Sequence, residues 1–262
     1  MIPPGISLDS IRASLGDRRL FPASCLAVFV GGSMARGWHH ARSDADLYVI
    51  TAEPWCGDSN GSTPVSVTPD TVPTNVIYID ERRWELRYWL DSQVDQVLDR
   101  VSWHAFQSDD SAGQRISDVE VALLGRLESS LVVVGEQWIQ QRRGKLADSA
   151  FQSLFTLRAL AEAGACAEDA QGMLESGDRH AAVLAAQMAL GAAADAVSLS
   201  QGEFSLEEKW RARRLQAAAS PVLPFERYWE LITMQSFDPR HPETWVRSVV
   251  DVCRQVALAI DV

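Results

Sequence analysis

The sequence predicts an α+β fold: an N-terminal α/β domain with a small mixed sheet, followed by an all-helical bundle. Short apolar runs bounded by Gly and Pro dominate residues 1–100, which is typical of buried strands. From about Ala147 onward the apolar pattern is helical throughout. A chain of 262 residues can bury two such cores. We place the domains at residues 1–140 and 141–262.

The N-terminal half begins with a short amphipathic pattern over residues 8–15, for which Ser7 is the expected N-cap. Four strands are expected after it, at residues 25–30, 46–51, 76–79 and 84–89. Residues 54–75 contain four prolines and two glycines, and we interpret them as a loop. Such a loop is either a functional lid or an insertion, and the sequence leaves both open.

Helices are expected over most of the remaining chain. Residues 91–104 form the first, and the capping-box pattern of Ser117 and Glu120 opens the second, which runs through Leu127. Residues 131–134 form a brief β-branched run. Nine alanines between Ala181 and Ala196 are typical of a tightly packed interior helix, with Asp178 as its N-cap. The last three expected helices begin at a capping box over residues 205–208, near Phe225, and at Glu243.

The net charge of the chain indicates which classes of partner it is suited to bind. The chain has 35 acidic and 24 basic side chains, a formal charge of −11, and such a surface repels phosphate backbones. We therefore consider nucleic acid an unlikely partner, whereas a cationic small molecule suits this charge. Four scattered cysteines form no CxxC pair, and no basic leader or uninterrupted apolar run of membrane-spanning length is visible. We expect a cytoplasmic protein with no membrane partner.

The segment Val28–Ile50 (VFVGGSMARGWHHARSDADLYVI) carries the clearest chemistry. An apolar strand ends in Gly31-Gly32-Ser33, a turn that can present backbone N–H groups to phosphate oxygens. Asp44 and Asp46 directly enter the next strand, where residues two apart share a face. Two adjacent carboxylates repel each other unless a divalent cation lies between them, and Mg²⁺ prefers oxygen ligands together with substrate phosphates.

This segment resembles the signature of the nucleotidyltransferase superfamily that includes DNA polymerase β. The resemblance implies that Gly32 and Ser33 hold nucleotide phosphates and that Asp44 and Asp46 bind two Mg²⁺ ions. Arg42 and Ser43 lie in the spacer beside the metal pair, and we assign both to nucleotide binding.

The superfamily also has a third carboxylate on a later strand, and Glu85 is the candidate. Alternation places Glu85 on the same face as Arg87 and Trp89, so an ordinary ion pair with Arg87 is the alternative role. The strand WELRYW resembles that of the streptomycin/spectinomycin-type aminoglycoside nucleotidyltransferases. In those enzymes the strand's glutamate is proposed to deprotonate the acceptor hydroxyl. The resemblance thus implies a catalytic and metal-binding set of Asp44, Asp46 and Glu85.

A weaker resemblance extends into the helical half. The stretch GEFSLEEKWRARRL is similar to a bundle segment in which a lysine reaches the nucleotide phosphates, and Lys209 is the match. The alternative is a solvated basic helix face. For Tyr228 the sequence leaves two roles open, a contact to the nucleotide and a place in the core.

These observations predict a Mg²⁺-dependent enzyme that transfers a nucleoside monophosphate from a nucleoside triphosphate, expected to be ATP, and releases pyrophosphate. The expected acceptor is a hydroxyl of a small, cationic, aminoglycoside-like molecule. A protein or tRNA acceptor is the alternative. A silent binding module on the same fold has no need of three converging carboxylates.

Overall fold

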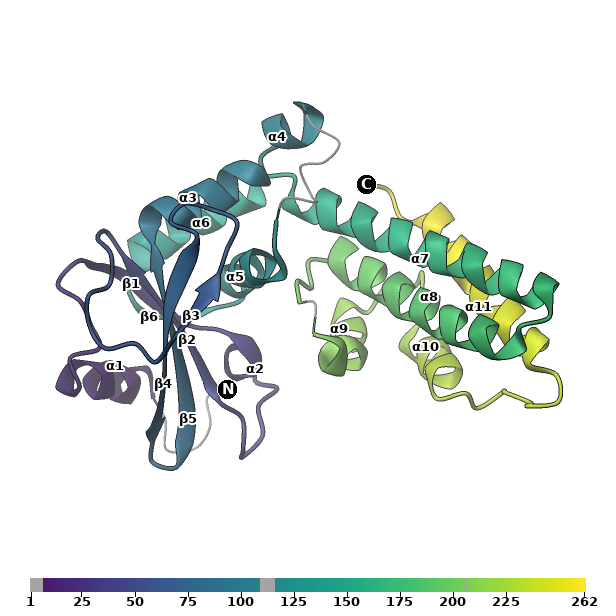
Figure 1. Cartoon of the computed structure of the whole chain (residues 1–262), viewed down its shortest axis with the longest axis horizontal. Helices are drawn as coiled ribbons and strands as arrows, with labels where there is room; N and C mark the ends of the chain where they lie inside the picture. Colours follow the sequence, from purple (N-terminus) through teal and green to yellow (C-terminus); the bar gives the residue numbers. More distant parts are fainter. Residues whose placement is uncertain (1–6, 109–115, 206) are drawn as a thin grey trace. The chain divides into compact units, whose positions relative to one another are not determined.

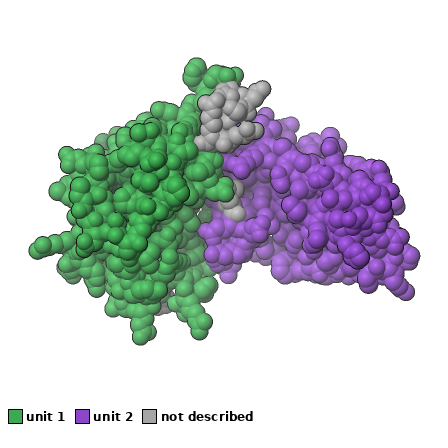
Figure 2. All heavy atoms as spheres, viewed as in Figure 1, with its two compact units in different colours: residues 1–149 green, residues 150–262 purple. Residues whose placement is uncertain are grey.

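The computed structural model describes residues 7–108, 116–205 and 207–262, and it divides into two compact units, Met1–Ser149 and Ala150–Val262 (Figure 2). The boundary expected at 140/141 falls inside helix α6 (Glu136–Ala147), which belongs to the first unit. Tertiary contacts hold this helix there: Trp138 donates to Asp91 at 2.9 Å, and Arg143 donates to the carbonyl of Leu127 at 3.0 Å.

The first unit is built on a six-stranded mixed sheet, which confirms the predicted α+β class (Figure 1). Its strand order is β3-β4-β5-β2-β1-β6, and of the five strand pairs among the described residues the β2–β5 pair is parallel and the other four are antiparallel. The strands are β1 (Cys25–Val30), β2 (Ala45–Thr51), β3 (Gly61–Pro64), β4 (Thr71–Ile79), β5 (Arg82–Leu90) and β6 (Leu131–Val134).

Short helices α1 (Leu8–Asp17) and α2 (Gly32–Ala35) flank the N-terminal strands of this unit. Ser7 caps α1 as predicted by accepting from the backbone N–H of Ser10. The predicted helix over residues 91–104 is two helices, α3 (Asp91–Arg100) and α4 (Trp103–Ser108). Ser117 and Glu120 form the predicted capping box of α5 (Asp118–Glu128).

The loop prediction for residues 54–75 is wrong in its second half, because β3 and the start of β4 form a hairpin there. Gln93 of α3 donates to the carbonyls of Pro69 and Thr71, and the backbone N–H and hydroxyl of Ser66 both donate to Glu120. The prolines of this segment indicate a loop, because proline has no N–H to donate within a sheet. Pro64 is nevertheless tolerated because β3 is an edge strand. These contacts anchor the hairpin to α3 and α5.

The second unit is helical, as predicted. It comprises α7 (Phe151–Ser176), α8 (Arg179–Ser200), a 3₁₀ turn η2 (Glu208–Trp210), α9 (Arg211–Ala218), α10 (Phe225–Ile232) and α11 (Pro242–Ala259). Asp178 caps α8 by accepting from Ala181, as expected. The capping box expected over residues 205–208 includes Leu206, which lies outside the described residues; the structure starts this region with η2, which has Glu207 at its N-cap position.

Helix α8 is the centre of this unit's core. Several of its alanines, such as Ala186 and Ala193, are fully buried in the core that α8 shares with α7 and α11. By length and composition alone α8 could cross a membrane, but 67% of its apolar window is buried inside the protein. A core helix of a soluble protein has this combination.

Candidate active site

The site begins where β1 runs into α2. The N–H of Gly31 donates to the carbonyl of Asp46 at 2.9 Å, which ties the turn to β2. Gly32 has φ +64°, and a Cβ at this position would lie 2.3 Å from the Oδ2 atom of Asp46. Only glycine fits here, because any side chain would be strained and would displace the Asp46 carboxylate. The glycine therefore lets the turn approach the carboxylate closely.

Three carboxylates converge beside this turn. Asp44 directly precedes β2, and the parallel register of β2 and β5 sets Asp46 opposite Glu85. Asp44, Asp46 and Glu85 each offer an oxygen, all within 4.8 Å of one another, and all three side chains are half-buried. Three hard oxygen donors so arranged fit a divalent ion such as Mg²⁺. The structure thus brings together the three residues predicted as metal ligands.

Two arginines that the sequence did not predict as site residues, Arg83 and Arg87, also belong to this site. Arg83 bridges Asp44 and Glu85, with N–O distances of 2.8 and 3.1 Å. Arg87 lies between Glu85 and Asp46, at 2.5 and 3.5 Å. The alternative weighed for Glu85, an ion pair with Arg87, is therefore present together with the carboxylate cluster. Alternation along β5 places residues 83, 85 and 87 on one face, a signal that was readable in the sequence.

A buried aromatic side chain packs against one of these arginines, Arg87. Tyr48, two residues after Asp46 on β2, is buried and stacks on Phe29 with ring centroids 5.0 Å apart. The guanidinium groups of Arg87 and Arg126 lie 5.6 and 5.7 Å from the centre of its ring. Burial raises the pKa of Tyr48, so its hydroxyl stays protonated. This packing fixes Arg87 against the core.

The remaining predicted nucleotide-binding residues of the first unit differ in their surroundings. Ser33 is half-buried in α2, directly after Gly32. Ser43 is buried, and its hydroxyl accepts from the backbone N–H of His40 at 2.9 Å. Its carbonyl accepts from Arg82 at 2.8 Å, so Ser43 shapes the turn that leads into Asp44. Arg42 is exposed in that turn.

Lys209 belongs to the second unit, in η2. Its side chain is 71% exposed, pairs with Glu207 at 3.0 Å and lies 5.7 Å from the ring centre of Trp210. This exposure is compatible with either expected role, a phosphate contact or a solvated basic face.

The second unit also contains an ion cluster that joins α8 and α9. Asp195 of α8 accepts from Arg211 at 3.0 and 2.8 Å and from Arg214 at 2.6 Å. Arg214 is fully buried and Tyr228 is nearly so, with burial raising the pKa of Tyr228. The cluster fixes α9 on α8, and Tyr228 is a core residue of this unit.

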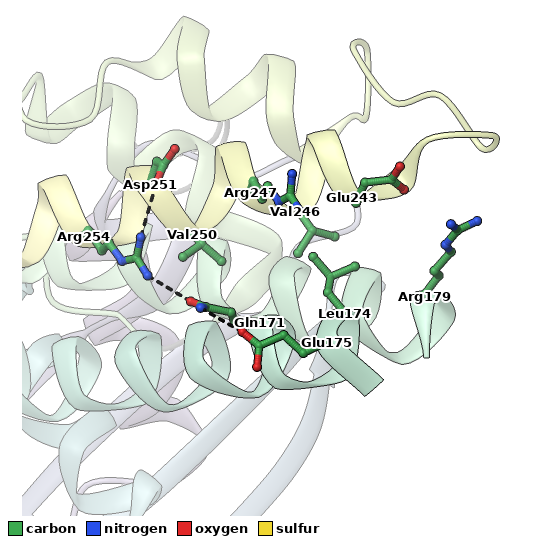
Figure 3. Close-up of a pocket in the computed structure, with 10 residues that line it drawn as sticks. All are labelled: Gln171, Leu174, Glu175, Arg179, Glu243, Val246, Arg247, Val250, Asp251 and Arg254. Carbon is green, nitrogen blue, oxygen red and sulfur yellow. Dashed lines mark hydrogen bonds and ion pairs between the residues drawn. The ribbon is translucent and has the colours of Figure 1, made fainter. Parts of the chain in front are cut away.

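The second unit also has a cavity of about 570 Å³ between α7 and α11 (Figure 3). Leu174, Val246 and Val250 line its apolar part, and Arg254 reaches across to Gln171 at 2.9 Å. Its three arginines face three carboxylates, so the cavity favours neither an anion nor a cation. The lining charges are Arg179, Arg247, Arg254, Glu175, Glu243 and Asp251.

Comparisons with known proteins bear on the fold. The sequence matches no protein-family model, and no curated protein matches it. The structure is similar to the crystal structure of a nucleotidyltransferase-like protein from Exiguobacterium sibiricum, with a TM-score of 0.50 and 12% sequence identity. The match covers 96% of this chain and 74% of that one. The chain therefore has a nucleotidyltransferase-like fold, with an acidic cluster suited to metal binding.

Proposed function

We propose that this protein is a Mg²⁺-dependent nucleotidyltransferase. It transfers a nucleoside monophosphate from a nucleoside triphosphate, ATP in our expectation, to a hydroxyl group and releases pyrophosphate. The observation that carries this proposal is the convergence of Asp44, Asp46 and Glu85 within 4.8 Å, at a glycine turn that admits no side chain beside Asp46. The nucleotidyltransferase-like fold supports it.

The carboxylates and the glycine turn have different roles in the proposed reaction. Asp44, Asp46 and Glu85 would hold two Mg²⁺ ions, which supply Lewis acidity at the phosphates and lower the pKa of a coordinated hydroxyl. Glu85 accepts the proton that leaves the acceptor hydroxyl when its oxygen attacks the α-phosphorus. Backbone N–H groups at Gly32 and Ser33 orient the phosphates.

Further nucleotide contacts come from residues outside the carboxylate set. Arg42 and Lys209 are exposed cations that would bind phosphate oxygens. Ser43 supports binding by holding the turn before Asp44, because its hydroxyl is engaged by His40.

For the acceptor, we propose a small, hydroxylated, cationic molecule of the aminoglycoside type. The formal charge of −11 favours a cationic molecule and disfavours a nucleic acid. A protein acceptor is the second candidate, because net charge does not discriminate against it. Protein and tRNA acceptors are both distinguishable by experiment. We retain the expectation of a cytoplasmic location.

The proposal is tested by nucleotide transfer. The protein is incubated with Mg²⁺ and each α-³²P-labelled nucleoside triphosphate, together with aminoglycosides, tRNA or a lysate in separate reactions. We expect label on an aminoglycoside, and its loss in Asp44→Asn and Asp46→Asn variants that keep the wild-type thermal unfolding temperature. Label on protein or RNA alone would overturn the acceptor assignment. Full turnover by both Asn variants would overturn the metal assignment.

A further inference from the structure

Arg83 and Arg87 both pair with the carboxylates, but they are held very differently. Arg87 is 16% exposed, and its guanidinium lies over the buried ring of Tyr48 while it contacts Asp46 and Glu85. Arg83 is 41% exposed, and the structure gives it the two carboxylates as its ion-pair partners. Arg87 is therefore packed in place, whereas Arg83 is held by partly solvated ion pairs of small energy.

The position of Arg83 in the chain also permits movement. It is the second residue of β5, one residue after the β4–β5 turn at Asp80 and Glu81, which both have positive φ angles. A side chain at the exposed end of a strand has fewer neighbours than one at its centre. Arg83 can therefore change rotamer without disturbing the register that sets Asp46 opposite Glu85.

Arg83 contacts carboxylate oxygens of two of the three residues that would hold a metal ion. Its Nη1 atom contacts Asp44 Oδ2 and its Nη2 atom contacts Glu85 Oε2, so it bridges two of the three ligands. A divalent ion binding at about 2.1 Å carries twice the charge of a guanidinium and attracts the same oxygens more strongly. Arg83 and the ion compete for these oxygens.

On these grounds we infer that Arg83 is a displaceable substrate-binding residue. It neutralises Asp44 and Glu85 when no metal is bound, leaves them when a divalent ion enters, and then binds a phosphate oxygen of the incoming nucleoside triphosphate. The inference rests on the proposed nucleotidyl transfer and deepens it. A freed arginine on the face of the sheet that carries the carboxylates is suited to a bidentate phosphate contact.

Two titrations test this inference on the full-length protein. The first measures Mn²⁺ binding without nucleotide by electron paramagnetic resonance. The second measures binding of α,β-methylene ATP at saturating Mn²⁺ by calorimetry. The variants are Arg83→Gln, Arg83→Lys as a charge-retaining second variant, and Arg12→Gln as a control on the exposed face of α1.

The two affinities are expected to change in opposite directions. Arg83→Gln removes the competing cation, so the Kd for Mn²⁺ falls roughly two- to fivefold. It also removes a phosphate contact, so the Kd for α,β-methylene ATP rises about tenfold. Arg83→Lys gives intermediate shifts, and Arg12→Gln matches wild type in both titrations.

Parallel weakening of both affinities in Arg83→Gln would overturn the inference, because it would show an arginine that only positions the carboxylates. Unchanged affinities would overturn it too. If wild type binds Mn²⁺ and α,β-methylene ATP normally in those cases, the proposed function survives. If wild type binds neither, the proposed function itself fails.

Discussion

Replacing Gly32 with alanine should damage the site far more than it damages the fold. The new Cβ would lie 2.3 Å from Asp46 Oδ2, whereas ordinary contacts begin at 3.4 Å, so the carboxylate must move by about 1 Å. The positive φ of 64° adds about 1–2 kcal/mol of backbone strain. A misplacement of about 1 Å in a reacting site costs on the order of 100-fold in rate.

The chain offers two matched controls for this substitution. Gly177 has φ +87° and Gly144 sits within α6, and an added Cβ at either position meets no atom within 4 Å apart from its chain neighbours and the local helix backbone. Gly177→Ala should therefore cost about 1–2 kcal/mol from strain alone and leave metal binding intact. Gly144→Ala should stabilise the protein by about 0.5–1 kcal/mol, since alanine favours a helix interior.

Urea unfolding and Mn²⁺ titration measure the two effects separately. We expect Gly32→Ala to lose about as much stability as Gly177→Ala, and in addition to lose at least about tenfold in Mn²⁺ affinity and about 100-fold in pyrophosphate release. Wild-type Mn²⁺ affinity in Gly32→Ala would refute the reasoning, because Asp46 would then not be a ligand positioned by this turn.

Three further predictions concern stability and thiol chemistry. Glu120→Ala should lower the free energy of unfolding by about 2–4 kcal/mol in urea titrations, since it strips a buried acceptor from Ser66 of the hairpin; a loss below about 0.5 kcal/mol would contradict this role. Asp195→Ala should cost about 3–5 kcal/mol by leaving a buried arginine without its carboxylate, whereas wild-type stability would show the cluster to be dispensable. Burial raises the pKa of Cys25 to about 11 and that of Cys253 to about 12, so at pH 8 a thiol reagent should modify exposed Cys56 first, as mass spectrometry would show. The raised pKa values of Cys25 and Cys253 mean that the folded state favours their protonated thiols. The stability that the two protonated thiols contribute is fully present below about pH 9 and is lost as the pH rises through about 11 to 12.

Local signals in the sequence sufficed for much of the fold. The strand at residues 25–30 has the predicted bounds, because an apolar run lies between Pro22 and a glycine pair. Side-chain caps at Ser7, Ser117 and Asp178 also formed as predicted, since each depends on residues within one turn. Such features need no knowledge of tertiary contacts.

Features that depend on distant residues were less accessible. The hairpin at β3 and β4 is stabilised by side chains of α3 and α5, while its prolines suggest a loop. Helix α6 joins the first unit through Asp91 and Leu127, contacts that no local pattern reveals. The pairing of Asp46 with Glu85 follows from a parallel register between strands far apart in the sequence. The family resemblance, rather than periodicity, proposed that pair.

The arginines explain how this fold can keep three carboxylates together without a metal ion between them. Carboxylates within 4.8 Å repel one another strongly when half-buried, and that repulsion would oppose folding. With Arg83 and Arg87 the cluster carries one net negative charge, so the metal-free protein avoids most of that cost. The same cations lower metal affinity, and a protein that held both arginines rigidly would bind Mg²⁺ poorly. Packing Arg87 on Tyr48 and leaving Arg83 partly solvated resolves the conflict, because one cation preserves the geometry while the other can leave.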